Sequence, residues 1–161
     1  MITRRRFLHS SATGVALVCG WSASAIDALA AEKFEVTHTD AEWRKLLTPD
    51  QYAVLRQEAT ERPFSSPLNR EKRRGTFACA GCGLENFSSA TKFESGTGWP
   101  SFWAPIEKAV ITKKDTSLGT VRIAVECRRC GGHLGHVFDD GPKPTGLRYC
   151  MNGVALKFKK E

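Results

Sequence analysis

The chain has 161 residues, a formal net charge of +7 and 41% apolar residues, including four Trp and nine Phe. This length predicts one folded domain, and the aromatic content excludes an intrinsically disordered or collagen-like chain. The sequence contains no run of about 20 apolar residues, which excludes a multi-span membrane protein.

Residues 1–30 have the pattern of an export leader. Residues 3–8 read TRRRFL, in which consecutive arginines precede Phe-Leu as in twin-arginine signals. An uncharged, mildly apolar stretch follows and ends in a small-x-small pattern, ALA. We therefore expect cleavage near Ala30, a folded domain over residues 31–161 with a net charge of +5, and a periplasmic location. The alternatives are an ordinary basic arm and an uncleaved anchor.

Two short helices are predicted at the start of the folded domain. Thr39 and Glu42 have the spacing of a capping box, which begins a helix whose apolar face carries Trp43, Leu46 and Leu47. Thr48 followed by Pro49 begins a second helix that runs to about Thr60, with Tyr52, Leu55 and Ala59 along it.

Beyond these helices the pattern becomes that of strands and loops. Alternating residues predict strands at 75–79, 110–112, 120–126 and 148–158. In the third of these, Val121, Ile123 and Val125 share one face. The sequence thus predicts a mainly β (α+β) domain, with two helices packed on an antiparallel β core.

Five cysteines remain once Cys19 leaves with the leader, and four of them form two Cys-x-x-Cys pairs. The pairs are Cys79 with Cys82 and Cys127 with Cys130. Such pairs suit a tetrahedral thiolate site for one structural Zn²⁺, which would join two distant hairpins. Two disulfides or a redox-active pair are the alternatives.

The fifth cysteine, Cys150, lies in a polar context. Strand periodicity places it on one face with Arg148 and Asn152, and places Tyr149 and Met151 on the other. A neighbouring cation is expected to depress the thiol pKa and favour a nucleophile. A buried structural cysteine is the alternative, and the local sequence does not decide between them.

Two histidines, His133 and His136, follow the second pair of cysteines. They can be spare metal ligands, core histidines or general acids. Because four cysteines already complete a zinc shell, the ligand role is the least favoured. Together with Asp140 and Cys150 the two histidines resemble a catalytic constellation.

Three motifs resemble those of the B-type methionine sulfoxide reductases, the family that reduces the R epimer of methionine sulfoxide. They are 96–102 (GTGWPSF), 133–138 (HLGHVF) and 146–152 (GLRYCMN). The resemblance extends from Trp43 to Phe158 and includes both cysteine pairs. It implies a fold of two antiparallel β-sheets with short N-terminal helices, clamped by a structural zinc site of four cysteines.

The resemblance also implies roles for individual residues. Cys150 would be the nucleophile that becomes a sulfenic acid, while His133 and His136 would orient the sulfoxide oxygen and deliver the proton. Asn152 and Arg148 would keep the site polar and favour the thiolate. Asp140 would orient a histidine. Trp99 would bind the S-methyl group of the substrate, and Phe102 would also contact the substrate. Plain core packing is the alternative for Trp99.

One departure from the family pattern affects recycling. Many members carry a second, resolving cysteine, in several of them near the Gly-Trp-Pro-Ser-Phe segment, where this chain has Glu94, Ser95 and Thr97. We therefore expect an external reductant, a thioredoxin-like protein or a small thiol, in place of an intramolecular disulfide.

The expected partners follow from this assignment. They are oxidised proteins or peptides as substrates in protein repair, with no nucleic acid, no membrane contact beyond the leader, and a monomeric chain. Two other hypotheses are a non-catalytic zinc-knuckle binding module and a nucleic-acid-binding zinc protein. The second would use Lys113-Lys114 and Arg128-Arg129, but these charges are scattered and the leader exports the chain.

Overall fold

The structure, a computed structural model, describes residues 34–117 and 119–161. The export leader expected over residues 1–30, including its cleavage position, lies outside the described residues. Within the described ranges, none of the helices has the length and apolar character needed to cross a membrane.

The two helices described begin where predicted, the first at the predicted capping box and the second at a capping box that was not predicted from the sequence. The Thr39 side chain accepts a hydrogen bond from the Glu42 backbone N–H before α1 (Asp40–Leu46), and Thr48 is bonded in the same way to Gln51 before α2 (Pro49–Gln57). These contacts satisfy backbone N–H groups that the helix itself leaves unpaired. The prediction that the second helix reaches Thr60 was wrong, because Glu58 adopts a left-handed conformation (φ 58°) and the helix ends at Gln57.

The helices contribute one apolar side to the core. Trp43, Tyr52 and Leu55 are buried, and so is Leu47, the residue that follows α1. Leu46, predicted to share the buried face, is 59% exposed. It is the last residue of a helix of seven, and Leu47, in an extended conformation, occupies the core position instead.

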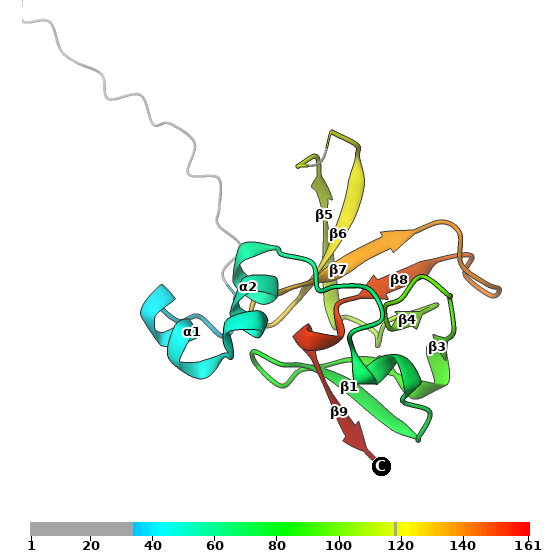
Figure 1. The fold of residues 1–161 in the computed structure, drawn as a ribbon, viewed down its shortest axis with the longest axis horizontal. Coiled ribbons are helices and arrows are strands. Elements are labelled where there is room, and N and C mark those ends of the chain that lie inside the picture. Colours follow the sequence, from blue (N-terminus) through cyan, green and yellow to red (C-terminus); the bar gives the residue numbers. More distant parts are fainter. Residues whose placement is uncertain (1–33, 118) are drawn as a thin grey trace, which may run out of the picture. The chain divides into compact units, whose positions relative to one another are not determined.

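Among residues 34–117 and 119–161, nine strands form two antiparallel sheets, which confirms the predicted fold class (Figure 1). The three-stranded sheet has the order β2-β1-β9, with β1 at Gly75–Cys79, β2 at Glu85–Ser88 and β9 at Leu156–Lys160. The six-stranded sheet has the order β3-β4-β8-β7-β6-β5. Its strands are β3 (Lys92–Phe93), β4 (Ser101–Phe102), β5 (Val110–Asp115), β6 (Arg122–Cys127), β7 (His133–Phe138) and β8 (Arg148–Met151).

Three strand predictions need correction. The segment 148–158 supplies β8 to one sheet and β9 to the other, joined by a short 3-10 turn, Gly153–Ala155. The strand predicted at 110–112 continues to Asp115. The strand predicted at 120–126 is β6, from Arg122 to Cys127. Of the three residues predicted to share a face, Val125 is buried, whereas Ile123 is 39% exposed and Val121, just before the strand, is 65% exposed. These two residues belong to the end of the β5–β6 hairpin that extends away from the core (Figure 1).

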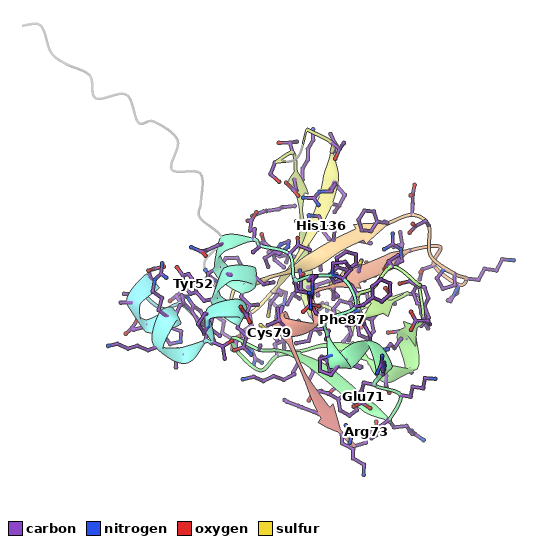
Figure 2. All side chains as sticks on the ribbon, in the orientation of Figure 1. Tyr52, Glu71, Arg73, Cys79, Phe87 and His136 are labelled. Atoms are coloured by element: carbon purple, nitrogen blue, oxygen red, sulfur yellow. The ribbon has the colours of Figure 1, made fainter. Side chains whose placement is uncertain are left out.

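An aromatic cluster joins the two sheets. Phe87 stacks on Phe102 with ring centroids 4.5 Å apart, and Phe77 meets Phe102 edge-on at 4.9 Å. All three are fully buried. Figure 2 shows Phe87 and Cys79 in the interior, whereas the ion pair of Arg73 with Glu71 lies at the periphery. Phe102 is therefore packed in the core, and its expected contact with substrate stays a prediction.

Candidate active site and cysteine cluster

Cys79, Cys82, Cys127 and Cys130, here the cysteine cluster, come together from the ends of β1 and β6 and the turns that follow them. Their sulfur atoms lie within 4.8 Å of one another, with Cys79 to Cys130 at 3.7 Å and Cys82 to Cys127 at 3.5 Å. Tetrahedral Zn²⁺ with Zn–S bonds of about 2.3 Å places its sulfur ligands about 3.8 Å apart. A disulfide bond would need about 2.05 Å. The cluster therefore fits a closed metal site of four thiolates.

A bulge in β7 places both histidines on one face of the sheet. Glu126 pairs with His133 and the next register pair joins Val125 to Gly135, so Leu134 is an extra residue in β7. In a regular strand, residues three apart point to opposite faces. The bulge removes this difference, and the two histidine rings lie 5.2 Å apart while Leu134 enters the core.

Cys150 lies on β8 between its partners in the sheet. It pairs with Ser101 of β4 on one side and with His136 of β7 on the other. Gly135 permits this close approach, since a Cβ there would collide with the Cys150 carbonyl oxygen. Side chains of directly opposed residues are neighbours in an antiparallel pair. The thiol and the imidazole are thus set against each other by strand register.

These two residues line a cavity of about 120 Å³, here the Cys150 cavity. The other lining residues are Thr60, Trp99, Arg122, Gly135, Phe138 and Asn152. The volume is well below the roughly 300 Å³ of a typical small-molecule pocket. The Cys150 cavity is therefore suited to the end of a side chain rather than to a large cofactor.

The resting Cys150 thiol is harder to ionise than the sequence indicated. Burial raises its pKa, whereas the hydrogen bond with Thr97 and the charge of Arg148 act in the opposite direction without prevailing. The Thr97 hydroxyl lies 3.8 Å from the sulfur. The expectation of a depressed thiol pKa is thus incorrect for this state, and ionisation requires a base or a bound substrate.

Arg148 is held by Asp140 rather than left free for other partners. Its Nε and guanidinium NH2 donate to the two carboxylate oxygens at 2.8 Å each, and its guanidinium lies 4.5 Å from the centre of the Phe138 ring. The same bonds lower the pKa of Asp140 and raise that of Arg148. Asp140 was expected to orient a histidine; its partner is Arg148, which it holds beside Cys150.

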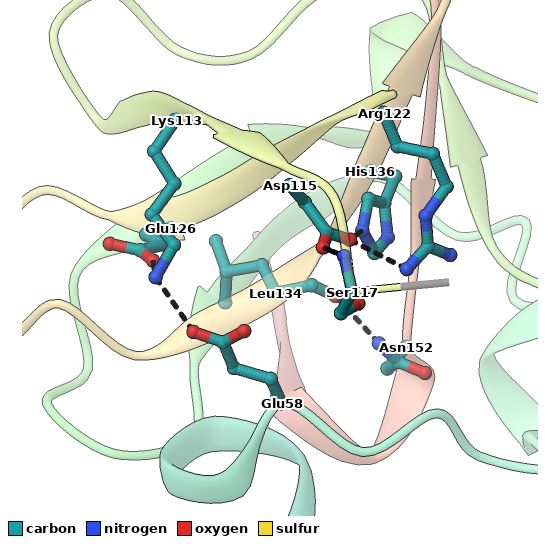
Figure 3. A network of polar contacts seen from close by, with 9 residues as sticks. All are labelled: Glu58, Lys113, Asp115, Ser117, Arg122, Glu126, Leu134, His136 and Asn152. Carbon is teal, nitrogen blue, oxygen red and sulfur yellow. Dashed lines mark hydrogen bonds and ion pairs between the residues drawn. The ribbon is translucent and has the colours of Figure 1, made fainter. Parts of the chain in front are cut away.

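The two histidines differ in their surroundings. His133 is 2% exposed, does not line the Cys150 cavity, and neither ring nitrogen has a hydrogen-bond partner among the described residues. Burial, followed by the proximity of His136, lowers its pKa to about 4, so it is neutral at neutral pH. His136 is the histidine placed in the Cys150 cavity, and its Nε2 lies 2.8 Å from a carboxylate oxygen of Asp115 (Figure 3).

Glu61 was missed in the sequence, although it contacts two cavity residues. Its carbonyl oxygen accepts a hydrogen bond from Trp99 Nε1 at 3.1 Å, and its backbone N–H donates to Asn152 at 3.0 Å. Its carboxylate accepts from the backbone N–H groups of Gly153 and Val154 at 2.6 and 2.9 Å. The charge pattern alone gave no signal for this residue, because its partners are about 40 to 90 positions away.

A larger cavity of about 690 Å³ has Glu61 in its lining. Its walls come from α2, the segment after it and the 3-10 turn before β9, and they contain no cysteine or histidine. Size alone would select this cavity, but its lining offers no thiol and no imidazole. We therefore place the candidate active site in the smaller Cys150 cavity.

The chain is similar to a known domain and to several known proteins over most of its length. Residues 47–160 match the SelR domain. The peptide methionine sulfoxide reductase MsrB of Methanosarcina barkeri is 60% identical over 78% of this chain and 89% of its own length. The corresponding proteins of Leptospira interrogans (54%; 80% and 98%) and Pseudomonas putida strain W619 (56%; 78% and 95%) are similarly close. The chain belongs to the MsrB family.

Membership of the MsrB family confirms the predicted enzyme class: the protein is an oxidoreductase. The region matched by the family contains all four residues of the cysteine cluster and every residue of the Cys150 cavity.

Proposed function

We propose that the protein reduces methionine-R-sulfoxide in peptides or proteins to methionine, and so repairs oxidised proteins. The observation that carries the proposal is the placement of the Cys150 thiol opposite His136 in a small cavity with Trp99 in its wall. An indole face accepts an S-methyl group, while the imidazole contacts the sulfoxide oxygen. An apolar wall and a polar wall on different sides of sulfur support discrimination between epimers.

The reaction transfers one oxygen atom. The Cys150 sulfur attacks the sulfoxide sulfur, the oxygen accepts a proton and moves to Cys150, and methionine leaves. The thiol becomes a sulfenic acid and the substrate sulfur is reduced by two electrons. An external thiol then attacks the sulfenic acid, releasing water and leaving a mixed disulfide, which a second thiol resolves. Arg148 supports the thiolate, and Asn152, fixed by Glu61 and by the Leu134 carbonyl oxygen, lines the cavity.

We further propose that the cysteine cluster holds one structural Zn²⁺. The sulfur separations, the four-thiol donor set and the burial of three of the four residues support this assignment. A metal in a closed shell supplies folding energy and takes no part in catalysis.

The cellular setting is also a proposal. The twin-arginine pattern of the leader supports export to the periplasm, and a route for folded cargo would let the metal bind before transport. The reductant would then be a thioredoxin-like protein or a small thiol in that compartment. We also propose that the enzyme is a monomer and has no nucleic acid partner.

The decisive experiment offers a peptide containing either epimer of methionine sulfoxide to the protein in the presence of dithiothreitol. We expect reduction of the R epimer only, and no turnover by Cys150→Ser with unchanged metal content. A wild-type protein that leaves the R epimer intact, or a Cys150→Ser variant that retains more than a few per cent of turnover, would contradict the proposal.

A further inference from the structure

Asp115 is a buried carboxylate that neither the sequence motifs nor the proposed function uses. It ends β5, and its side chain is 8% exposed. One oxygen accepts from the Ser117 backbone N–H at 2.9 Å, and the other lies 2.6 Å from the Arg122 guanidinium and 2.8 Å from His136 Nε2. Figure 3 shows the three contacts converging on this carboxylate from β6, β7 and the turn after β5.

The arrangement determines which nitrogen of His136 carries a proton. Hydrogen bonds from Ser117, together with those from His136 and Arg122, hold the pKa of Asp115 well below its usual range. An ionised carboxylate only accepts hydrogen bonds, so Nε2 must be protonated. In the neutral ring Nδ1 then has a lone pair, and it is the nitrogen left for a partner in the Cys150 cavity.

We propose that Asp115 is a positioning residue that makes His136 the base for Cys150, in a Cys150–His136–Asp115 relay across neighbouring strands. This inference rests on the proposed function and deepens it. The thiol proton passes from Cys150 to His136 Nδ1, and the sulfur attacks as the thiolate. The same Nδ1–H then donates its proton to the sulfoxide oxygen as the S–O bond to methionine breaks. Asp115 stays ionised throughout and stabilises the transient imidazolium.

The groups around His136 are consistent with this path. Asp115 faces it from β5, Arg122 from β6, His133 from β7 and Cys150 from β8. Arg122 is paired with Asp115, and His133 is neutral at neutral pH. Because burial keeps the resting thiol protonated, a base beside Cys150 has a task to perform.

The test compares Asp115→Asn with the wild-type protein in single-turnover reduction of a methionine-R-sulfoxide peptide from about pH 6 to about pH 9.5, a range that spans ordinary thiol ionisation. At neutral pH we expect a loss of at least about tenfold, since a positioned acid or base contributes about 10²- to 10⁴-fold. The loss should shrink as the pH rises, because hydroxide then removes the thiol proton. Asp115→Glu should recover part of the neutral rate.

Asp139→Asn is the matched control, because Asp139 is an exposed carboxylate next to β7, and it should leave rate and pH profile unchanged. An Asp115→Asn variant with the wild-type rate overturns the relay. So does a slow variant whose pH profile runs parallel to the wild type, which would indicate a structural role alone.

A second measurement needs no substrate, so it separates failure of the relay from failure of the proposed function. Iodoacetamide alkylation of Cys150, followed by peptide mass analysis, should be slower at neutral pH in Asp115→Asn than in the wild type and equal at high pH. Equal alkylation rates in Asp115→Asn and the wild type at neutral pH overturn the relay. This holds even if the folded protein has no reductase activity.

Discussion

The same functional group occurs in two regions with opposite surroundings. In the cysteine cluster each thiol has three others within 4.8 Å, and three of the four residues are buried. Cys150 has no other thiol beside it among the described residues; its neighbours are Thr97, Arg148 and His136, and it lines a cavity together with His136. A thiol is therefore made structural or reactive by its neighbours. The neighbours in the cysteine cluster can be recognised in the sequence from the two Cys-x-x-Cys pairs. The neighbours of Cys150 come from distant segments that strand pairing brings together.

The largest expected effect falls on the cysteine cluster. Cys130→Ser should lose the metal and most of the folded protein, because the binding free energy of a structural zinc is folding free energy, about 10 to 16 kcal/mol in zinc-finger peptides. Metal analysis and circular dichroism provide the measurement, with Cys150→Ser as the matched thiol loss that should keep both metal and fold. Equal melting temperatures for the metal-free and metal-bound wild type would show that the metal in the cysteine cluster does not stabilise the fold.

A second comparison separates the two aromatic residues expected to bind substrate. Phe102→Ala should lower the free energy of unfolding by about 3 to 5 kcal/mol, because it empties a buried ring site, and should leave KM unchanged below its melting temperature. Trp99→Ala should raise KM, since Trp99 lines the Cys150 cavity. Urea unfolding and steady-state kinetics on both variants distinguish the roles. A changed KM in Phe102→Ala, measured under conditions in which the variant is fully folded, would show that Phe102 contributes to substrate binding.

A smaller effect is expected from His133 in acid. Its pKa of about 4 in the folded protein lies below the ordinary 6.5, so the unfolded chain takes up the proton first. Stability from this group is present above about pH 6.5 and is lost as the pH falls towards 4, by about 3 kcal/mol. His133→Phe should remove this part of the acid sensitivity in urea titrations at successive pH values. An unchanged pH dependence would mean that His133 is not buried as a neutral ring.

The local features of the sequence predicted local structure well. Only near neighbours were needed to recognise the capping box at Thr39, the helix start at Thr48 and Pro49, the strand at Gly75–Cys79 and the cysteine pairs. The family motifs predicted the fold class in the same way, because they specify residues over most of the domain.

The features that the sequence did not predict are contacts between distant residues. Asp115 meets His136 across 21 positions, and Glu61 meets Gly153 across 92, so no periodicity relates them. The bulge at Leu134 depends on pairing with β6, and Phe102 is core because Phe87 of the other sheet stacks on it. The family resemblance made Asp140 a candidate to orient a histidine. The sheet geometry instead places Asp115, a carboxylate from another hairpin, against His136.

The smallest expected effect on stability has a sharp chemical signature, and it comes from making the Cys150 region resemble the cysteine cluster. Thr97 is partly exposed in the loop between β3 and β4, and its hydroxyl already lies 3.8 Å from the Cys150 sulfur. In Thr97→Cys a second thiol is placed within reach of the sulfenic acid. Condensation of the two releases water and forms an intramolecular disulfide, the step for which the wild type is proposed to need an external thiol.

After one turnover with excess methionine-R-sulfoxide and no reductant, the wild-type protein should gain one oxygen at Cys150 and form a dimedone adduct. Thr97→Cys should instead lose two hydrogens and form no adduct, with zinc content and melting temperature within error of the wild type. Ser95→Cys, a thiol in the same loop whose parent side chain bonds Thr97 and Ser101 and not Cys150, is the control that should keep the adduct. An intramolecular disulfide in the wild type, accompanied by release of the metal, would mean that the cysteine cluster supplies the resolving thiol. The two regions would then be chemically coupled rather than separate.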